Sequence, residues 1–193
     1  MSNKVRQILL MDDHVCPWWL CFTFDNPLRR LIHNPDGLLR DWIAPGQTAI
    51  DIGCGMGYFT LPMARLVGSS GRVIAVDLQA QMLDRLQRRA ERAGLQSRIQ
   101  PHRCQPDTLA LGEPADFILT FWMVHEVRNQ SAFLQEIRSL LKPTAHYLLV
   151  EPKLHVAAAS FLKTVETAQA AGLRPIAQPK VGLSRAVLFG PAM

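Results

Sequence analysis

From about residue 47 onward, short apolar stretches alternate with longer stretches in which apolar residues recur every three or four positions. The first pattern predicts buried β-strands and the second predicts amphipathic helices. We expect strands at 48–53, 72–78, 97–104, 115–123, 145–152, 174–181 and 183–190. We expect helices at 57–68, 79–95, 130–142 and 156–173. Such alternation of strand and helix predicts a parallel sheet with helices on both faces.

The end of the chain departs from this alternation. Its two expected strands are separated by Gly182 alone, so we expect them to pair as an antiparallel hairpin. Pro175 and Pro179 place the first of the two at a sheet edge, because proline has no N–H for the ladder. Gly94 and Gly172 stand in the last turns of two of the expected helices, where glycine typically ends a helix. The fold class is therefore α/β, a Rossmann-like doubly wound sheet with an antiparallel end.

Length and composition narrow the classes of protein. A chain of 193 residues suits one hydrophobic core, and 48% hydrophobic with 19% charged residues is typical of a globular protein. No apolar run approaches the roughly 18 residues that a membrane helix needs, and the start of the chain shows no signal-peptide pattern. We therefore expect a cytoplasmic protein without a membrane span. The net charge of +5 permits an anionic partner without requiring one.

A glycine-rich turn stands between the first expected strand and the first expected helix. It reads Asp51-Ile-Gly53-Cys-Gly55-Met-Gly57. Glycines there allow a sharp turn and the close approach of a ligand, and the helix start attracts an anionic group. Asp77 ends the next expected strand, 20 residues after Gly57, where an acid suits the hydroxyls of a ribose. The combination predicts a nucleotide-like ligand.

Two common nucleotide motifs are absent from the sequence. A dinucleotide fingerprint requires a third small residue at position 58, where Tyr58 stands instead. The phosphate-binding pattern G-x-x-x-x-G-K-[ST] does not occur either. These observations disfavour an NAD-dependent oxidoreductase and a P-loop protein.

With these motifs in place, the sequence resembles the class I S-adenosylmethionine-dependent methyltransferases of the small-molecule type. The matching stretches are DIGCGMGYFT (51–60), VIAVDL (73–78), ADFILTFWMVHEV (115–127) and LLKPTAHYLLVEP (140–152). The resemblance implies a seven-stranded sheet of order 3-2-1-4-5-7-6 with strand 7 antiparallel. It also implies a cofactor-binding domain over 46–193 and an N-terminal segment over 1–45 that covers the active site.

The resemblance further implies S-adenosyl-L-methionine as cofactor and S-adenosyl-L-homocysteine as product. Asp51 and the glycines would face the methionine part, Asp77 the ribose and Leu78 the adenine. The family often has Asp after strand 3, where Gln105 stands in this sequence, with Asp107 as the alternative. The full expected cofactor set is Asp51, Gly53, Gly55, Gly57, Asp77, Leu78, Gln105 and Phe121.

The residues after the fourth expected strand are candidates for catalysis, because ligands bind at the carboxyl ends of such strands. His125 is the candidate general base, with substrate positioning and a purely structural role as the alternatives. Phe121 or Trp122 would cover the adenine or the sulfonium, and their alternation along a strand predicts that one of them is ordinary core. The expected substrate pocket comprises Trp18, Trp19, Trp122 and Glu126.

The N-terminal segment gathers aromatic and sulfur-containing side chains. Trp18 and Trp19 would form an apolar wall over the pocket or pack an N-terminal helix onto the sheet. His14, Cys16 and Cys21 lack the ligand number and spacing of a structural zinc site, so we expect no metal. The remaining thiols, Cys54 and Cys104, are expected to be free, and their role stays open.

A stripe of arginines on the second expected helix raises nucleic acid as a partner. The residues are Arg85, Arg88, Arg89 and Arg92, with Asp84 and Glu91 interspersed, so a solvated helix face explains them equally well. We therefore expect a small-molecule acceptor. The alternatives are a non-catalytic S-adenosylmethionine-binding protein and an RNA methyltransferase. The sequence leaves open the acceptor, the acceptor atom (O, N, C or S) and the oligomeric state.

Overall fold

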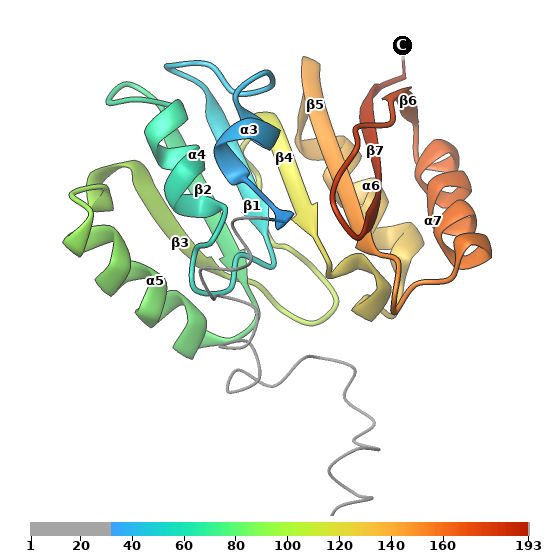
Figure 1. Ribbon diagram of the computed structural model, residues 1–193, viewed down its shortest axis with the longest axis horizontal. Coiled ribbons are helices and arrows are strands. Elements are labelled where there is room, and N and C mark those ends of the chain that lie inside the picture. The colour runs from blue at the N-terminus through green and yellow to red at the C-terminus, as the bar shows by residue number, and fades with distance from the viewer. Residues whose placement is uncertain (1–31, 193) are drawn as a thin grey trace, which may run out of the picture.

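The computed structural model describes residues 32–192 of the chain (Figure 1). Its centre is a seven-stranded sheet of order β3-β2-β1-β4-β5-β7-β6. Strand β7 runs antiparallel to both of its neighbours, and all the other neighbouring pairs are parallel. The strands are β1 Thr48–Ile52, β2 Arg72–Asp77, β3 Ile99–Arg103, β4 Ala115–Phe121, β5 Leu141–Pro152, β6 Leu173–Ala177 and β7 Ser184–Pro191. The predicted fold class, strand order and terminal hairpin are confirmed.

Helices cover both faces of the sheet, as the alternating pattern predicts (Figure 1). One face packs against α3, α4 and α5, and the other packs against α6 and α7. The helices are α3 Pro35–Leu39, α4 Thr60–Leu66, α5 Ala80–Arg92, α6 Gln130–Leu140 and α7 Ala158–Ala170. Two short 3-10 turns, η2 Gln96–Arg98 and η3 Val124–Glu126, precede β3 and follow β4.

Successive residues of the central strands enter two hydrophobic clusters, one on each face. In β1, Ala49 belongs to the cluster under α4 and α5, and Ile50 belongs to the cluster under α6 and α7. Every residue of β1 is buried. This two-sided burial explains why the strand reads as a continuous apolar run rather than an alternating one.

Several boundaries differ from the sequence-based prediction. Strand β4 ends at Phe121 instead of continuing to 123. Strand β5 begins at Leu141, and a register shift against β4 accommodates the residues around Pro143. Pro175 lies in the edge strand β6 as predicted, whereas Pro179 lies beyond its end.

The described part of the N-terminal segment packs onto the domain. Leu39 and Ile43 are buried in the same cluster as the side chains of α4. Trp18 and Trp19, together with His14, Cys16 and Cys21, lie outside the described residues. Between residues 32 and 192, no helix is both long and apolar enough to cross a membrane.

Candidate functional site

The glycine turn is held against the end of β2 by its own backbone. The N–H groups of Gly53 and Cys54 both donate to the carbonyl of Val76, at 2.9 and 3.0 Å, and the N–H of Gly57 donates to the carbonyl of Cys54 at 2.9 Å. All three glycines have positive φ, +73° for Gly53, +52° for Gly55 and +86° for Gly57. The turn therefore adopts a left-handed backbone that disfavours residues with a Cβ.

The three glycines differ in what surrounds them. A Cβ on Gly53 would lie 2.9 Å from the Cγ of Met123, and a Cβ on Gly57 would overlap Cδ1 of the buried Leu86. A Cβ on Gly55 would meet no atom within 4 Å. Packing and positive φ thus both disfavour a side chain at Gly53 and Gly57, while Gly55 faces open space where a ligand can approach.

Asp51 lies under the turn rather than in solvent. It is 2% exposed, and the Thr60 hydroxyl donates to its Oδ2 at 2.5 Å. Thr60 is the first residue of α4, so Asp51 fixes the start of the helix relative to the glycine turn.

Asp77 is hydrogen-bonded to the glycine on the open side of the turn. The N–H of Gly55 donates to its Oδ2 and the N–H of Gln79 donates to its Oδ1, both at 2.9 Å. The side chain is 8% exposed, and burial raises its pKa despite these hydrogen bonds. Each carboxylate oxygen accepts about two hydrogen bonds, so both retain capacity for a ligand hydroxyl. Gly55, which has no Cβ, thus lies beside the buried carboxylate of Asp77, and this combination fits the methionine and ribose parts of S-adenosylmethionine.

The other residues predicted for the adenine lie beside this site. Leu78 is partly buried directly after Asp77. The N–H of Cys104 donates to the carbonyl of Asp77 at 3.2 Å, so the segment after β3 passes the end of β2. Gln105 is exposed there and bridges to Thr108 in a tight turn, and Asp107 is exposed too. The structure thus brings the turn of Gln105 and Asp107 next to Asp77.

The backbone of Trp122 corrects one prediction. Its φ is +62°, a left-handed conformation that is uncommon for a large side chain. Because the chain leaves the extended conformation there, Phe121 and Trp122 do not point to opposite faces, and their ring centroids lie 5.5 Å apart. Both rings also lie about 5 Å from the His33 ring, at 5.1 and 5.0 Å. The alternation is therefore interrupted at Trp122, but the expectation that one of the two residues is ordinary core is confirmed, since Phe121 is buried in the core and Trp122 is only partly buried.

His33 and Trp122 are tied together through the turn between β6 and β7. The His33 Nε2 lies 2.7 Å from the carbonyl oxygen of Gly182, and the Ser184 hydroxyl donates to the same oxygen at 2.9 Å. The Trp122 Nε1–H donates to the Ser184 hydroxyl oxygen at 2.9 Å. The Tyr58 hydroxyl donates to the carbonyl of His33 at 2.7 Å. Residues from four parts of the chain thus form one wall next to the ends of β1 and β4.

His125 has a partner that the sequence analysis did not identify. Its Nδ1 lies 2.5 Å from Oε2 of Glu151, the last residue but one of β5, and Glu151 is 2% exposed. The hydrogen bond with Glu151 raises the pKa of His125, burial opposes this rise, and the negative charges of Glu151 and Glu126 add to it. The imidazole is 30% exposed and accessible to a small molecule. In the sequence, Glu151 stands out only as an acid near the end of the apolar strand β5, which pairs with β4.

The His125–Glu151 pair predicts that the free energy of unfolding depends on pH. Because the pKa of folded His125 exceeds its unfolded value of about 6.5, protonated His125 stabilises the fold below that pH, and the stabilisation is lost as pH rises through the folded pKa. We expect the difference in unfolding free energy between the wild type and His125→Gln to decrease from about pH 6 to about pH 8. Urea unfolding at several pH values measures this difference.

His146 provides the matched control, because burial lowers its pKa. Its contribution has the opposite sign, since the fold disfavours its protonated form below about pH 6.5. The difference between the wild type and His146→Gln is therefore expected to increase with pH. Parallel stability curves for the wild type and His125→Gln would contradict the raised pKa.

The two described cysteines are poor nucleophiles. Burial raises the pKa of Cys54 well above its usual value and raises the pKa of Cys104 to about 11. Both thiols therefore stay protonated at neutral pH, which disfavours thiolate chemistry. Within residues 32–192, no cluster of three or more His, Cys, Asp or Glu side chains is arranged to hold a metal ion.

The arginine stripe is partly engaged in holding the glycine turn. Arg89 donates to the carbonyl of Met56 at 2.9 Å, and Arg85 lies 3.9 Å from the Met56 sulfur. Arg88 and Arg92 are exposed. Two of the four arginines thus support the turn from α5, which weakens the stripe as a surface for nucleic acid.

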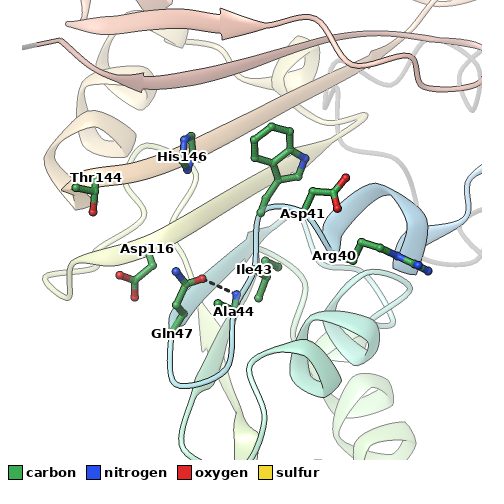
Figure 2. A pocket seen from close by; sticks show the side chains of 9 residues that line it. Arg40, Asp41, Ile43, Ala44, Gln47, Asp116, Thr144 and His146 are labelled. Atoms are coloured by element: carbon green, nitrogen blue, oxygen red, sulfur yellow. Dashed lines mark hydrogen bonds between the residues drawn. The ribbon is translucent and has the colours of Figure 1, made fainter.

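A separate cavity of about 280 Å³ opens at the amino-terminal edge of the sheet (Figure 2). Asp116 lies in its wall and accepts the N–H of Thr48 at 2.9 Å and the Lys142 ammonium at 2.7 Å. The rings of Trp42 and His146 lie 5.6 Å apart on another side. Thr48 begins β1, so this cavity is at the opposite end of the strand from the glycine turn.

Several known proteins similar to this chain are methyltransferases. A family model described as a methyltransferase domain matches residues 49–144. A 2-phytyl-1,4-naphtoquinone methyltransferase of Nostoc sp. is 32% identical over 160 residues, which are 78% of this chain and 66% of that protein. A ubiquinone biosynthesis O-methyltransferase of Caulobacter vibrioides is 32% identical over 129 residues, which are 66% of this chain and 48% of that protein. The chain thus spans about half to two thirds of these curated relatives.

The fold is shared with a solved structure as well. A SAM-dependent methyltransferase from Aquifex aeolicus superimposes with a TM-score of 0.82 at 22% identity, and the match covers 91% of this chain and 98% of that one. At this identity the likeness concerns the fold alone.

Proposed function

We propose that this chain, which belongs to the class I S-adenosylmethionine-dependent methyltransferases, transfers a methyl group from S-adenosylmethionine to a small-molecule acceptor. The observation that carries the proposal is the open side of Gly55 next to the buried carboxylate of Asp77. When bound, S-adenosylmethionine supplies an electrophilic methyl group on a positively charged sulfur.

In this proposal the turn and the end of β2 hold the cofactor. Asp77 accepts hydrogen bonds from the ribose hydroxyls, and Leu78 borders the adenine, with Gln105 on the adjoining turn. Gly55 gives the methionine part room at the backbone, while Asp51, Gly53 and Gly57 shape the turn. Phe121 packs against Phe59 at the base of the site, with the two ring centroids 4.4 Å apart.

The substrate pocket would lie over the carboxyl ends of β4 and β5. Trp122, Glu126 and His125 border it, and residues 1–45 cover it, with Trp18 and Trp19 contributing from outside the described residues. The contact of His33 with Phe121 and Trp122 supports this arrangement, because it brings the N-terminal segment to the end of β4. Most of the chemistry is alignment of the acceptor with the methyl group, which such a covered pocket favours.

A small acceptor fits this chain better than RNA. Arg85 and Arg89 are engaged with Met56, so the basic stripe is shorter than the sequence indicates. The curated relatives described above are named for a phytyl naphthoquinone and for ubiquinone biosynthesis, not for RNA. The proposal includes a cytoplasmic location, in line with the sequence pattern.

Asp77→Ala tests the cofactor site. We expect the affinity for S-adenosylhomocysteine to fall about ten- to hundredfold, because charge-assisted hydrogen bonds worth roughly 1.5–3 kcal/mol are lost. Isothermal titration calorimetry measures the affinity, and circular dichroism shows whether the variant stays folded after losing the bonds from Gly55 and Gln79.

Asp84→Ala is the matched control, because Asp84 is an exposed acid on the adjacent helix α5. Unchanged affinity in a folded Asp77→Ala protein removes Asp77 from the site. Binding of NAD in preference to S-adenosylhomocysteine by the wild type would refute the proposed function as a whole.

A further inference from the structure

We infer that the acceptor presents a weakly acidic hydroxyl group, as in a phenol or an enol, that His125 takes its proton, and that Glu151 positions His125 for this step. The inference rests on the proposed function and names the acceptor class of the same site. It comes from the arrangement of two side chains on neighbouring strand ends.

Glu151 is anchored on both of its oxygens. Its Oε1 accepts the backbone N–H of Val124 at 2.9 Å, and its Oε2 meets Nδ1 of His125 at 2.5 Å. A carboxylate only accepts hydrogen bonds, so the hydrogen between the two side chains belongs to Nδ1. The neutral imidazole then has its lone pair on Nε2, which is the form that accepts a proton.

The pair lies at the edge of the sheet that carries the glycine turn. His125 follows β4, Glu151 is the last residue but one of β5, and β4 pairs with both β5 and β1. Met123, two residues before His125, reaches the turn, because its Cγ would lie 2.9 Å from a Cβ on Gly53. The His125–Glu151 pair is therefore connected to the proposed cofactor site through the short segment 123–125.

The charges around His125 favour proton transfer from a neutral acceptor. The acidic groups that act on it are Glu151 from β5 and Glu126 from η3, and Gln130 of α6 caps the same turn by donating to the carbonyl of Val124 at 3.1 Å. Two carboxylates stabilise the imidazolium that forms when a hydroxyl gives up its proton. They oppose an amine acceptor, which arrives as an ammonium ion and must lose its positive charge before its lone pair is available.

The acceptor hydroxyl must be acidic enough to give its proton to an imidazole. A phenol with a pKa near 10, like that of tyrosine, is within a few units of a histidine whose pKa is raised above about 6.5. In the transfer, the acceptor O–H bond breaks and its proton moves to Nε2 of His125. A lone pair of the oxygen forms the O–C bond as the bond between methyl carbon and sulfur breaks, and that electron pair returns to sulfur. Water later takes the proton from the imidazolium.

Glu151→Gln provides a sharp test of the positioning role. The N–H of Val124 requires an acceptor, so the amide oxygen stays on Val124 and the amide NH₂ faces Nδ1 of His125. That arrangement forces the imidazole hydrogen onto Nε2, which removes the proton-accepting lone pair. We expect ¹⁵N NMR of the histidine ring to show hydrogen on Nδ1 in the wild type and on Nε2 in Glu151→Gln, with a lower His125 pKa in the variant. Glu166→Gln, an exposed acid on α7, is the control.

Activity is measured with S-adenosylmethionine carrying a ¹³C-methyl group and a panel of catechol, 4-hydroxybenzoate, benzyl alcohol, benzylamine and thiophenol. We expect O-methylation of a phenol, with kcat about 10²–10⁴-fold lower in Glu151→Gln and S-adenosylhomocysteine affinity unchanged. An Nε2–H tautomer in the wild type, transfer to the amine, alcohol or thiol instead, or no transfer to either phenol by a protein that binds S-adenosylhomocysteine overturns the inference. Failure of the wild type to bind S-adenosylhomocysteine overturns the proposed function instead.

Discussion

His125→Ala is expected to lower kcat by about 10²–10⁴-fold, the usual contribution of a general base. The substitution removes the imidazole that borders the proposed pocket and leaves Glu151 buried without its side-chain partner. Affinity for S-adenosylhomocysteine is expected to change little, because the glycine turn and Asp77 lie on β1 and β2. In the wild type, the rate is expected to rise with pH through a midpoint above about 6.5, because the hydrogen bond to Glu151 raises the pKa of His125.

Steady-state kinetics and melting temperature together separate three roles for His125. A base gives a lower kcat and loss of the pH-dependent rise. A residue that only positions the acceptor gives a higher KM with kcat and the pH profile nearly unchanged. A structural histidine gives unchanged kinetics with a lower melting temperature, and that outcome would remove His125 from the chemistry. His146→Ala, at the opposite edge of the sheet, is the control for loss of a half-buried histidine.

The variants Gly57→Ala and Gly55→Ala are expected to lose different properties, stability in the first and ligand affinity in the second. At Gly57 the added Cβ overlaps Leu86 in the core, and the positive φ adds strain, so we expect a loss of about 2–5 kcal/mol in unfolding free energy. At Gly55 the added Cβ projects into open space, and the strain alone costs about 1–2 kcal/mol. That methyl group occupies the ligand's side of the turn, so we expect S-adenosylhomocysteine affinity to fall by more than about a hundredfold, or roughly 2.7 kcal/mol.

Urea unfolding and calorimetry on both variants measure this contrast. Ala64→Gly, in the buried core of α4, is a reference for a glycine–alanine change away from the turn. A Gly55→Ala protein that is folded and binds normally would show that the open side of the turn is not the ligand's side. A fully stable Gly57→Ala protein would mean that Leu86 moves aside at little cost.

The sheet was predictable from the sequence because its signals are local or follow from the resemblance. Buried strands such as Thr48–Ile52 are continuous apolar runs, and Gly94 and Gly172 end their helices with φ of +65° and +84°. The glycine turn was identified for the same reason, since its residues are contiguous.

The His125–Glu151 pair was not predictable in this way, because 26 positions separate its members and only the pairing of β4 with β5 brings them together. The same holds for Asp77 and Gly55, whose hydrogen bond shows that the acid supports the turn, in addition to the ligand contact proposed for it. The alternation rule failed at Trp122, because the left-handed backbone of this one residue ends β4 at Phe121 instead of at the predicted residue 123. Long-range contacts and isolated backbone reversals leave little trace in a pattern of apolar positions.

The carbonyl of Gly182 has a consequence for how acceptor preference can change. It takes hydrogen bonds from Ser184 and His33, and Ser184 in turn holds Trp122. A Cβ on Gly182 would lie 2.8 Å from the carbonyl oxygen of Ile32, so no side chain fits there without moving the N-terminal segment. A substitution at Gly182 is therefore expected to displace His33 and Trp122 together, so the β6–β7 turn controls the shape of the proposed pocket without supplying any of the proposed reacting groups.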